Sequence, residues 1–256
     1  ACTYACEYLH FNASERYREK AKEFSKKALD LAPDLAQSHI ARGTAHALFG
    51  EYRDADQAFQ RATDINPFVF EAWYLHARCK VHQGEIEKAA LLFEKAASVR
   101  PNDYQSLILQ ASQLRKLGQE EASLKALREG LERARTFLEF NPDDDRAWGL
   151  GAFALLTLGQ ENEAKAWMDN CLLHAARCSA STYNAACFYA RKGELEKSLD
   201  FLEMSMGVGT ISKQWVVQDE DLDPVREHPR FAGIMAKFPG EHCADDDQKP
   251  IPEKVV

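Results

Sequence analysis

The sequence lacks the local motifs by which most enzyme classes are recognised. It contains neither of the glycine-rich phosphate loops GxxxxGK[ST] and GxGxxG, no HExxH zinc motif and no GxSxG nucleophile elbow. Its seven cysteines include no CxxC pair, and an odd number at irregular gaps makes a poor disulfide or zinc framework. We therefore expect reduced cysteines that pack as small hydrophobic side chains. The chain is predicted to have no catalytic activity, no cofactor and no metal of its own.

An excess of positive charge is also missing. The chain has 32 Lys and Arg against 40 Asp and Glu, a formal net charge of −8. Nucleic acids and anionic membranes attract clusters of Lys and Arg, so this balance argues against both as partners. No apolar run approaches the roughly 20 residues of a membrane helix, and no secretory signal is visible. We expect a cytoplasmic protein, and we interpret a chain that starts at Ala1 inside a helix-like pattern as part of a longer polypeptide.

The stretch Ala36–Pro101 contains one pattern written twice. Its marked positions coincide when the copies are aligned: Gly50 with Gly84, Ala55 with Ala89, Phe59 with Phe93, Ala62 with Ala96, and Pro67 with Pro101. The members of each pair are 34 residues apart, and Pro33 lies another 34 upstream of Pro67. A fixed 34-residue period is typical of a helix–turn–helix repeat.

Each marked position has a physical reason. The paired alanines let two helices approach closely, and the paired phenylalanines fill the space between units. The glycines end the first helix of each unit in a left-handed conformation, and the prolines disfavour helix at the residue before them. From about residue 3 to about residue 206, the chain resembles the tetratricopeptide repeat (TPR) family. The resemblance implies an all-α, right-handed superhelical solenoid of about six helical hairpins with a C-terminal helical cap.

The repeat register divides the chain into parts. We expect a repeat array over 1–206, a helical cap over 207–240 and a flexible acidic tail over 241–256, with the array made of units at about 1–33, 34–67, 68–101, 102–142, 143–178 and 179–206. The unit 102–142 is seven residues longer than the period, about two helical turns, so the same face stays inward. Its second helix is predicted over about 119–140, with Gly130 as a point of close contact, and the unit should bend the array.

In this repeat family the first helix of each unit lines a concave groove. Carried onto this sequence, the resemblance assigns eight partner-binding candidates: Tyr74, Arg78, His82, Ile108, Arg115, Phe153, Tyr183 and Arg191. Aromatic and aliphatic groups interleaved with arginine suit an extended or helical peptide that carries acidic groups. We therefore expect a non-catalytic scaffold that binds a protein or peptide partner. The Lys/Asn clamp with which some family members hold chaperone C-termini is absent, because the equivalent positions include Ile40, Thr44 and Glu71.

Two alternatives remain open. The run YNAACFYARKGELEKSLDFLEMSMGVG and the following DEDLDPVREHPRF resemble the ends of TPR regions in multidomain bacterial signalling proteins. In such proteins the repeats follow a Ser/Thr kinase, a nucleotide cyclase or a winged-helix regulator, which implies a regulatory or sensor module acting in cis. The other alternative is a homo-oligomer, held together by Trp215 and the apolar residues of the cap.

Two groups of metal-ligating residues favour structural roles instead. His39 and His46 lie seven residues apart on one expected helix, at repeat positions equivalent to Trp73 and Lys80. The second group, Cys171, Cys178 and Cys187 with His174, has irregular spacing. Because Cys171 occupies the position of Ala62 and Ala96, we predict that it packs in the core.

Overall fold

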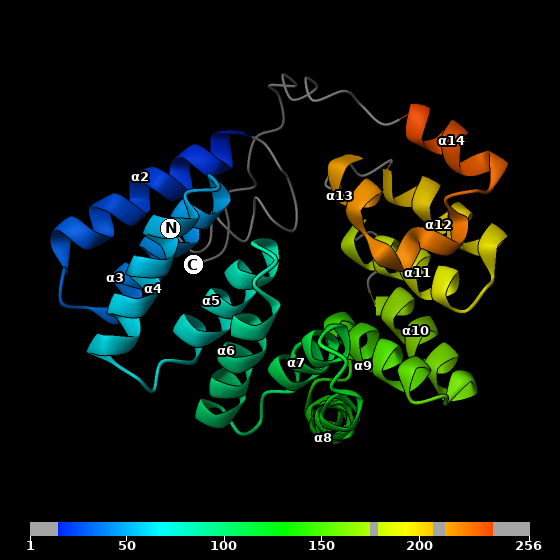
Figure 1. Ribbon diagram of the computed structural model, residues 1–256, viewed down its shortest axis with the longest axis horizontal. Coiled ribbons are helices and arrows are strands. Elements are labelled where there is room, and N and C mark those ends of the chain that lie inside the picture. Colours follow the sequence, from blue (N-terminus) through cyan, green and yellow to red (C-terminus); the bar gives the residue numbers. More distant parts are fainter. Residues whose placement is uncertain (1–14, 175–178, 207–212, 238–256) are drawn as a thin grey trace.

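The computed structural model describes residues 15–174, 179–206 and 213–237, and within these ranges the regular structure is helical, with no strand. Figure 1 shows the helices following one another as hairpins. The helices are α2 (Glu15–Leu31), α3 (Ala36–Leu48), α4 (Tyr52–Ile65), α5 (Phe70–His82), α6 (Ile86–Val99), α7 (Gln105–Lys116), α8 (Glu120–Phe140), α9 (Asp145–Thr157), α10 (Glu161–His174), α11 (Ser179–Arg191), α12 (Leu195–Met206), α13 (Lys213–Gln218), the 3₁₀-helix η1 (Glu220–Val225) and α14 (Pro229–Ala236).

The expected all-α fold of consecutive packed hairpins is confirmed. In the described ranges, α3 pairs with α4, α5 with α6, α7 with α8, α9 with α10, and α11 with α12. The expected first helix of the first unit and the acidic tail over 241–256 lie outside the described residues. Among the described helices, none combines the length and the apolar character needed to cross a membrane.

Glycine turns join the two helices of each hairpin. Five glycines have a positive φ between 71° and 81°, the left-handed region that glycine adopts without steric cost: Gly50, Gly84, Gly118, Gly159 and Gly193. The turn closes by backbone hydrogen bonds, as where the Glu85 amide donates to the Lys80 carbonyl at 3.0 Å. The predicted role of Gly50 and Gly84 as helix-ending residues is therefore confirmed.

A second recurring contact ties three of the units to the turn before them. Trp73 Nε1 donates to the carbonyl of Pro67, and Trp148 Nε1 donates to the carbonyl of Pro142, both at 2.8 Å. His39 fills the same position, six residues after Pro33, and its Nε2 lies 2.7 Å from the Pro33 carbonyl oxygen. The structural role expected for His39 is thus confirmed, since its ring replaces an indole in a repeated contact.

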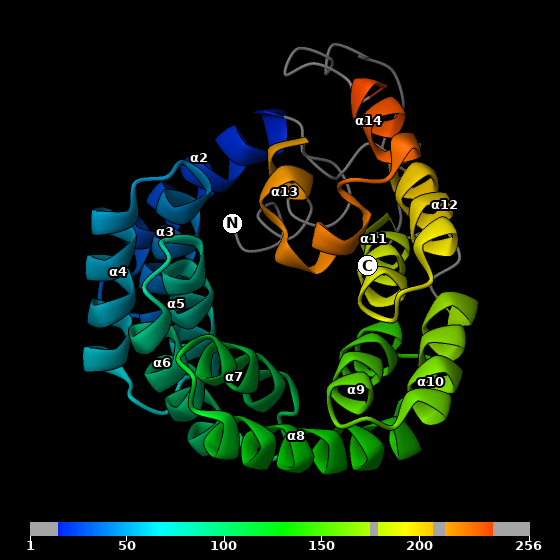
Figure 2. The same ribbon diagram turned by 45° about the vertical axis from the view of Figure 1, so that its right-hand side comes forward.

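The long unit contributes the longest helix of the described chain. Helix α8 has 21 residues, whereas α4 and α6 have 14 each. A Cβ placed on Gly130 of α8 would lie 2.8 Å from Ile108 Cγ1, which confirms Gly130 as a point of close contact. In Figure 2, α8 runs along the base of a ring, between an arm that ends in α7 and an arm that begins with α9.

The C-terminal helices lie against the last hairpin of the array. Figure 2 shows α7, α9 and α11 on the inner side of the ring, α8, α10 and α12 on its outer side, and α13 inside the ring. Helix η1 packs against α11, and α14 packs against α12. Val216, Leu222 and Val225 are completely buried. These short helices cover the core at the end of the array, as a solenoid cap must.

Candidate functional site

A polar row crosses the inner face, by which we mean the surface that α3, α5, α7, α9 and α11 turn toward the interior of the ring. The Tyr74 hydroxyl on α5 donates to Gln105 Oε1 on α7 at 3.1 Å. Arg146 on α9 donates from Nη2 to the same hydroxyl oxygen at 2.8 Å. Tyr74 itself is buried and meets Phe93 edge-to-face. The row therefore links three successive units and holds the Arg146 guanidinium in place.

Arg146 is not among the eight sequence-predicted candidates, although its register position faces inward. It is half-buried, and within the described chain its buried Nε has no hydrogen-bond acceptor. A guanidinium with donor capacity to spare suits a carboxylate, which accepts hydrogen bonds from two of its nitrogens at once. The inward position in the register is the signal that could have selected it.

The remaining candidates of the N-terminal and central units differ in access. Arg78 is half-buried and His82 is exposed, both on α5. Arg115 is exposed at the end of α7. Ile108 is buried in the core that α7 and α8 share, where its side chain packs against Gly130. The first three residues can reach a partner, whereas Ile108 packs in the core and supports α7, the helix that carries Arg115.

The three candidates of the C-terminal units, Phe153, Tyr183 and Arg191, already make contacts within the chain. The Tyr183 hydroxyl donates to Asp219 Oδ2 at 2.7 Å, and Cys187 Sγ lies 3.7 Å from the same oxygen. Arg191 Nε lies 3.7 Å from Asp221 Oδ1, and the Arg191 guanidinium carbon lies 5.6 Å from the centre of the Phe153 ring. Asp219 and Asp221 therefore sit on the residues that the sequence assigned to partner binding.

The acidic residues also face α7 on the other arm of the ring. Lys116 Nζ lies 3.6 Å from Glu220 Oε2. Burial raises the pKa of Asp221 above its usual value, and the positive charges of Arg191, Arg115 and Lys116 act in the opposite direction. Burial likewise raises the pKa of the Tyr183 phenol, so this group stays a hydrogen-bond donor near neutral pH. The inner face thus surrounds one acidic segment with a phenol, two arginines and a lysine.

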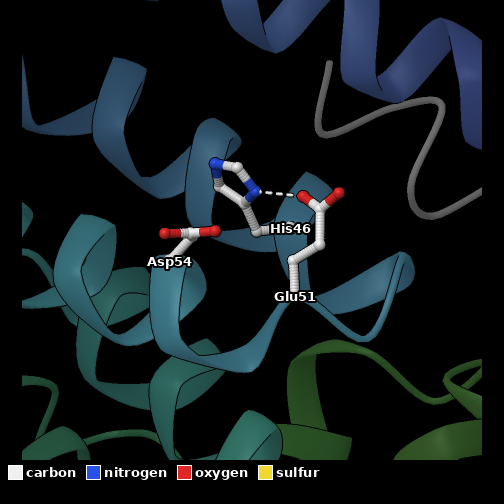
Figure 3. Close-up of side chains that lie close together, drawn as sticks. All are labelled: His46, Glu51 and Asp54. Carbon is white, nitrogen blue, oxygen red and sulfur yellow. Dashed lines mark hydrogen bonds and ion pairs between the residues drawn. The ribbon is translucent and has the colours of Figure 1, made fainter.

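One group of metal-ligating side chains stands apart from the inner-face contacts. Figure 3 shows His46, Glu51 and Asp54, whose ligand atoms lie within 4.8 Å of one another. His46 Nδ1 lies 2.5 Å from Glu51 Oε2, and Lys22 Nζ lies 3.2 Å from the other oxygen of Glu51. The two acids follow His46 at five and eight residues, across the turn between α3 and α4.

The next repeat explains this group. At positions 34 residues further on stand Lys80, Glu85 and Lys88, where both lysines pair with Glu85 and Lys80 Nζ lies 2.8 Å from it. The equivalent positions of two units therefore carry a polar contact between a first helix and the glutamate of its turn. We interpret the group around His46 as the same structural pair. The predicted burial of Cys171 is confirmed, and Cys178 lies outside the described residues.

The comparisons agree with this fold. Residues 70–103 match the family model described as tetratricopeptide repeat. Among curated proteins, protein O-mannosyl-transferase TMTC3 of Homo sapiens is 24% identical over 196 residues, 75% of this chain and 20% of the relative. Interferon-induced protein with tetratricopeptide repeats 3 of Mus musculus is 26% identical over 171 residues, 64% of this chain and 40% of the relative. The chain thus spans between a fifth and two fifths of these relatives.

Two solved structures share the fold over most of the chain. The APC/C hetero-tetramer Cut9–Hcn1 aligns at a TM-score of 0.60 and 16% identity, covering 85% of this chain and 41% of that chain. A thermophilic TPR protein of Thermus thermophilus aligns at 0.58 and 18% identity, covering 78% and 99%. The 34-residue register, the glycine turns and these matches show that the chain has the fold of a tetratricopeptide-repeat solenoid. Proteins of this kind generally mediate protein–protein interactions.

Proposed function

We propose that this chain is a protein-interaction module whose inner face binds an acidic segment of a partner protein. The observation that carries the proposal is the acidic run Asp219–Asp221, which lies on that face in contact with Tyr183, Arg191 and Lys116. A surface that holds carboxylates of its own chain offers the same chemistry to carboxylates of another protein. No catalytic step is part of this proposal.

The positive groups on the inner face extend beyond that acidic run. Arg78 on α5, Arg115 on α7 and Arg146 on α9 belong to successive units of the array. Arginine pairs with carboxylates through two parallel hydrogen bonds, and arginine and tyrosine are enriched among the residues that dominate binding energy. An extended segment laid across the units would meet these arginines in turn. An effector domain of the same polypeptide, the regulatory alternative, would use the same surface.

The test measures binding of a labelled acidic 12-residue peptide by fluorescence anisotropy, beside the same peptide with Asp and Glu replaced by Asn and Gln. The double substitution Arg78→Glu/Arg115→Glu is expected to weaken binding of the acidic peptide at least tenfold. It should change the melting temperature little, because Arg115 is exposed and Arg78 is half-buried.

The matched control places the same charge change on the second helices. Arg61 on α4 and Lys95 on α6 are both exposed, so Arg61→Glu/Lys95→Glu alters the net charge equally and away from the inner face. The proposal is wrong if both double variants bind the acidic peptide alike. It is also wrong if the amidated peptide binds as tightly as the acidic one.

A further inference from the structure

The segment Asp219–Val225 lies on the inner face much as a bound ligand would. Its two aspartates stand one residue apart, Asp219 against Tyr183 and Asp221 against Arg191. Glu220, between them, reaches toward Lys116 on the opposite arm. The next residue, Leu222, is completely buried beside the apolar residues of α11 and α12. The carboxylates thus contact a phenol and positively charged side chains, and the leucine side chain lies in the core.

Hydrogen bonds among neighbouring residues fix the conformation of this segment. Asp219 begins η1 as its capping residue, and its Oδ1 accepts from the Asp221 amide at 3.0 Å. Arg226 Nη2 donates to the Asp219 carbonyl oxygen at 2.8 Å. One carboxylate oxygen of Asp219 thus serves the cap, and the other accepts from Tyr183. The contacts on the inner face thus involve the residues of the pattern Asp-x-Asp-Leu.

We propose that Asp219–Val225 is an internal competitor for the inner face, and that the partner carries the same Asp-x-Asp-Leu pattern of two spaced carboxylates followed by a large aliphatic residue. This inference rests on the proposed function. The partner would take the contacts with Tyr183, Arg191 and Lys116 that the segment now makes. Binding would then require the segment to leave, so the chain regulates access to its own binding surface.

Three features make the segment displaceable. Its ion pairs with Lys116 and Arg191 are 3.6 and 3.7 Å long, and Glu220 is largely exposed, so solvent screens them. A 3₁₀-helix has poorer hydrogen-bond geometry than an α-helix. Burial raises the pKa of Asp221, because it disfavours the charged form of this carboxyl. A longer acidic partner that continues toward α5 and α9 adds Arg78 and Arg146, which lie beyond these contacts.

Covalent attachment explains why the segment nevertheless occupies the surface. A tethered segment acts at an effective concentration of about millimolar, so a short free peptide of the same sequence competes poorly with it. Weakening the contacts of the tethered segment alone should therefore increase the affinity for the free peptide. This behaviour separates an internal competitor from a permanent cap, whose loosening would not expose a binding site.

The experiment uses the full chain and a labelled peptide with the sequence of residues 217–226, VQDEDLDPVR. Asp219→Asn/Asp221→Asn in the protein is expected to raise the affinity for this peptide at least tenfold over the unsubstituted chain. Hydrogen exchange in residues 213–237 should become faster while exchange in α3 and α4 stays unchanged. Glu227→Gln is the matched control, because it removes an exposed acidic charge two residues after Val225.

A second variant covers the case in which apolar contacts alone keep the segment in place after the aspartates are replaced. Leu222→Ala removes the buried side chain that follows the aspartates, and it should change affinity and exchange in the same direction. The inference is overturned if exchange in residues 213–237 is unaltered in both variants. It is also overturned if the peptide with Asn at its Asp positions binds as well as VQDEDLDPVR does.

The outcomes separate this inference from the proposed function. Equal affinity of VQDEDLDPVR for the unsubstituted chain and for both variants, with Arg78→Glu/Arg115→Glu still weakening binding of the acidic 12-residue peptide, would refute the internal competitor and leave the binding function intact. Absence of peptide binding in every form, although exchange in residues 213–237 has become faster, would refute the proposed function itself.

Discussion

The first regular repeats and the later units build their cores and inner faces differently. Around Phe59 and around Phe93, the regular repeats form two small and separate groups of buried side chains. From Tyr104 to Tyr189, one continuous core joins α7 to α11. On α5 of the first region, Arg78 is half-buried and His82 is exposed, whereas in the second region Asp219 and Asp221 contact Tyr183 and Arg191 of α11.

This difference links the regularity of the repeat to the size of the core and to the accessibility of the binding surface. Units of equal length bury a modest core each, so their stability is nearly a sum of local terms, and binding surfaces commonly lie in such less stable parts. The longer helix α8 and its neighbours bury more apolar surface across unit boundaries. The later units are therefore the more rigid support, and in the regular repeats a partner can reach the inner face without displacing Asp219–Val225.

The largest expected effect is in the continuous core. A Cβ placed on Gly151 of α9 would lie 2.1 Å from Trp167 Cζ3, and Trp148 packs edge-on against the Trp167 ring. The indole cannot yield without moving its neighbour. Gly151→Ala should therefore lower the free energy of unfolding by about 3 kcal/mol, the upper range for overpacking. Urea denaturation followed by circular dichroism measures it.

Gly233 of α14 provides the matched control. A Cβ on Gly233 would meet no atom within 4 Å, among the described contacts of that helix. The same glycine-to-alanine change should leave stability unchanged or raise it by up to about 1 kcal/mol, because alanine favours helix. If both substitutions shift the denaturation midpoint alike, the tight contact between Gly151 and Trp167 is not a real constraint.

A smaller effect is expected where the regular repeats rely on charge. The Lys80 side chain is 5% exposed, and its Nζ lies 2.5 Å from Asp56 Oδ2 and 2.8 Å from Glu85 Oε1. Lys80→Met would leave both carboxylates without their shared cation. Because each carboxylate is about one third exposed, we expect a loss of about 2 kcal/mol, below the range for a fully buried pair. Thermal unfolding measures the change.

Lys88 pairs with the same Glu85 but is exposed, so Lys88→Met should change stability by less than about 0.5 kcal/mol. The cluster also predicts a pH dependence. Hydrogen bonds from Lys80 and Lys88 hold the pKa of Glu85 down to about 2, against an ordinary value of 4.5. A lowered pKa stabilises the fold above pH 4.5, and this contribution is lost as the pH falls toward 2. Unfolding curves in which Lys80→Met keeps the full dependence would contradict this assignment.

The parts of the fold that were predictable are those that the 34-residue period carries. Gly50 and Phe59 have counterparts one period away, and Cys171 takes a position that alanine fills elsewhere, so one unit informs the next. The long helix followed from the spacing of two prolines. The position of Asp219–Val225 was not predictable, because η1 lies beyond the last unit and its contact with Lys116 joins residues about a hundred positions apart.

The candidate site was predictable to a similar extent. The register predicted Tyr183 and Arg191 on the inner face and an acidic ligand, yet it could not show that Asp219 and Asp221 of the same chain contact these two residues. Nor could it show that Ile108 is buried, since that depends on the close approach of Gly130 on α8. Contacts between units of different length have no periodic signature in the sequence.

The smallest expected effect concerns a contact present in both regions, the hydrogen bond from a tryptophan indole to a proline carbonyl. Trp73→Phe and Trp148→Phe each remove a hydrogen bond to a proline carbonyl and keep an aromatic ring, so each should cost about 1 kcal/mol. The resulting increase in amide exchange should nevertheless reach different helices in the two variants. Trp73 belongs to a small core, so amide exchange should become faster mainly in α5 and α6. Trp148 lies against the continuous core, so its loss should be shared from α7 to α11. Exchange profiles that spread equally far in both variants would mean that the regular repeats and the later units form one cooperative unit, and that an accessible inner face at Arg78 does not depend on a less stable core.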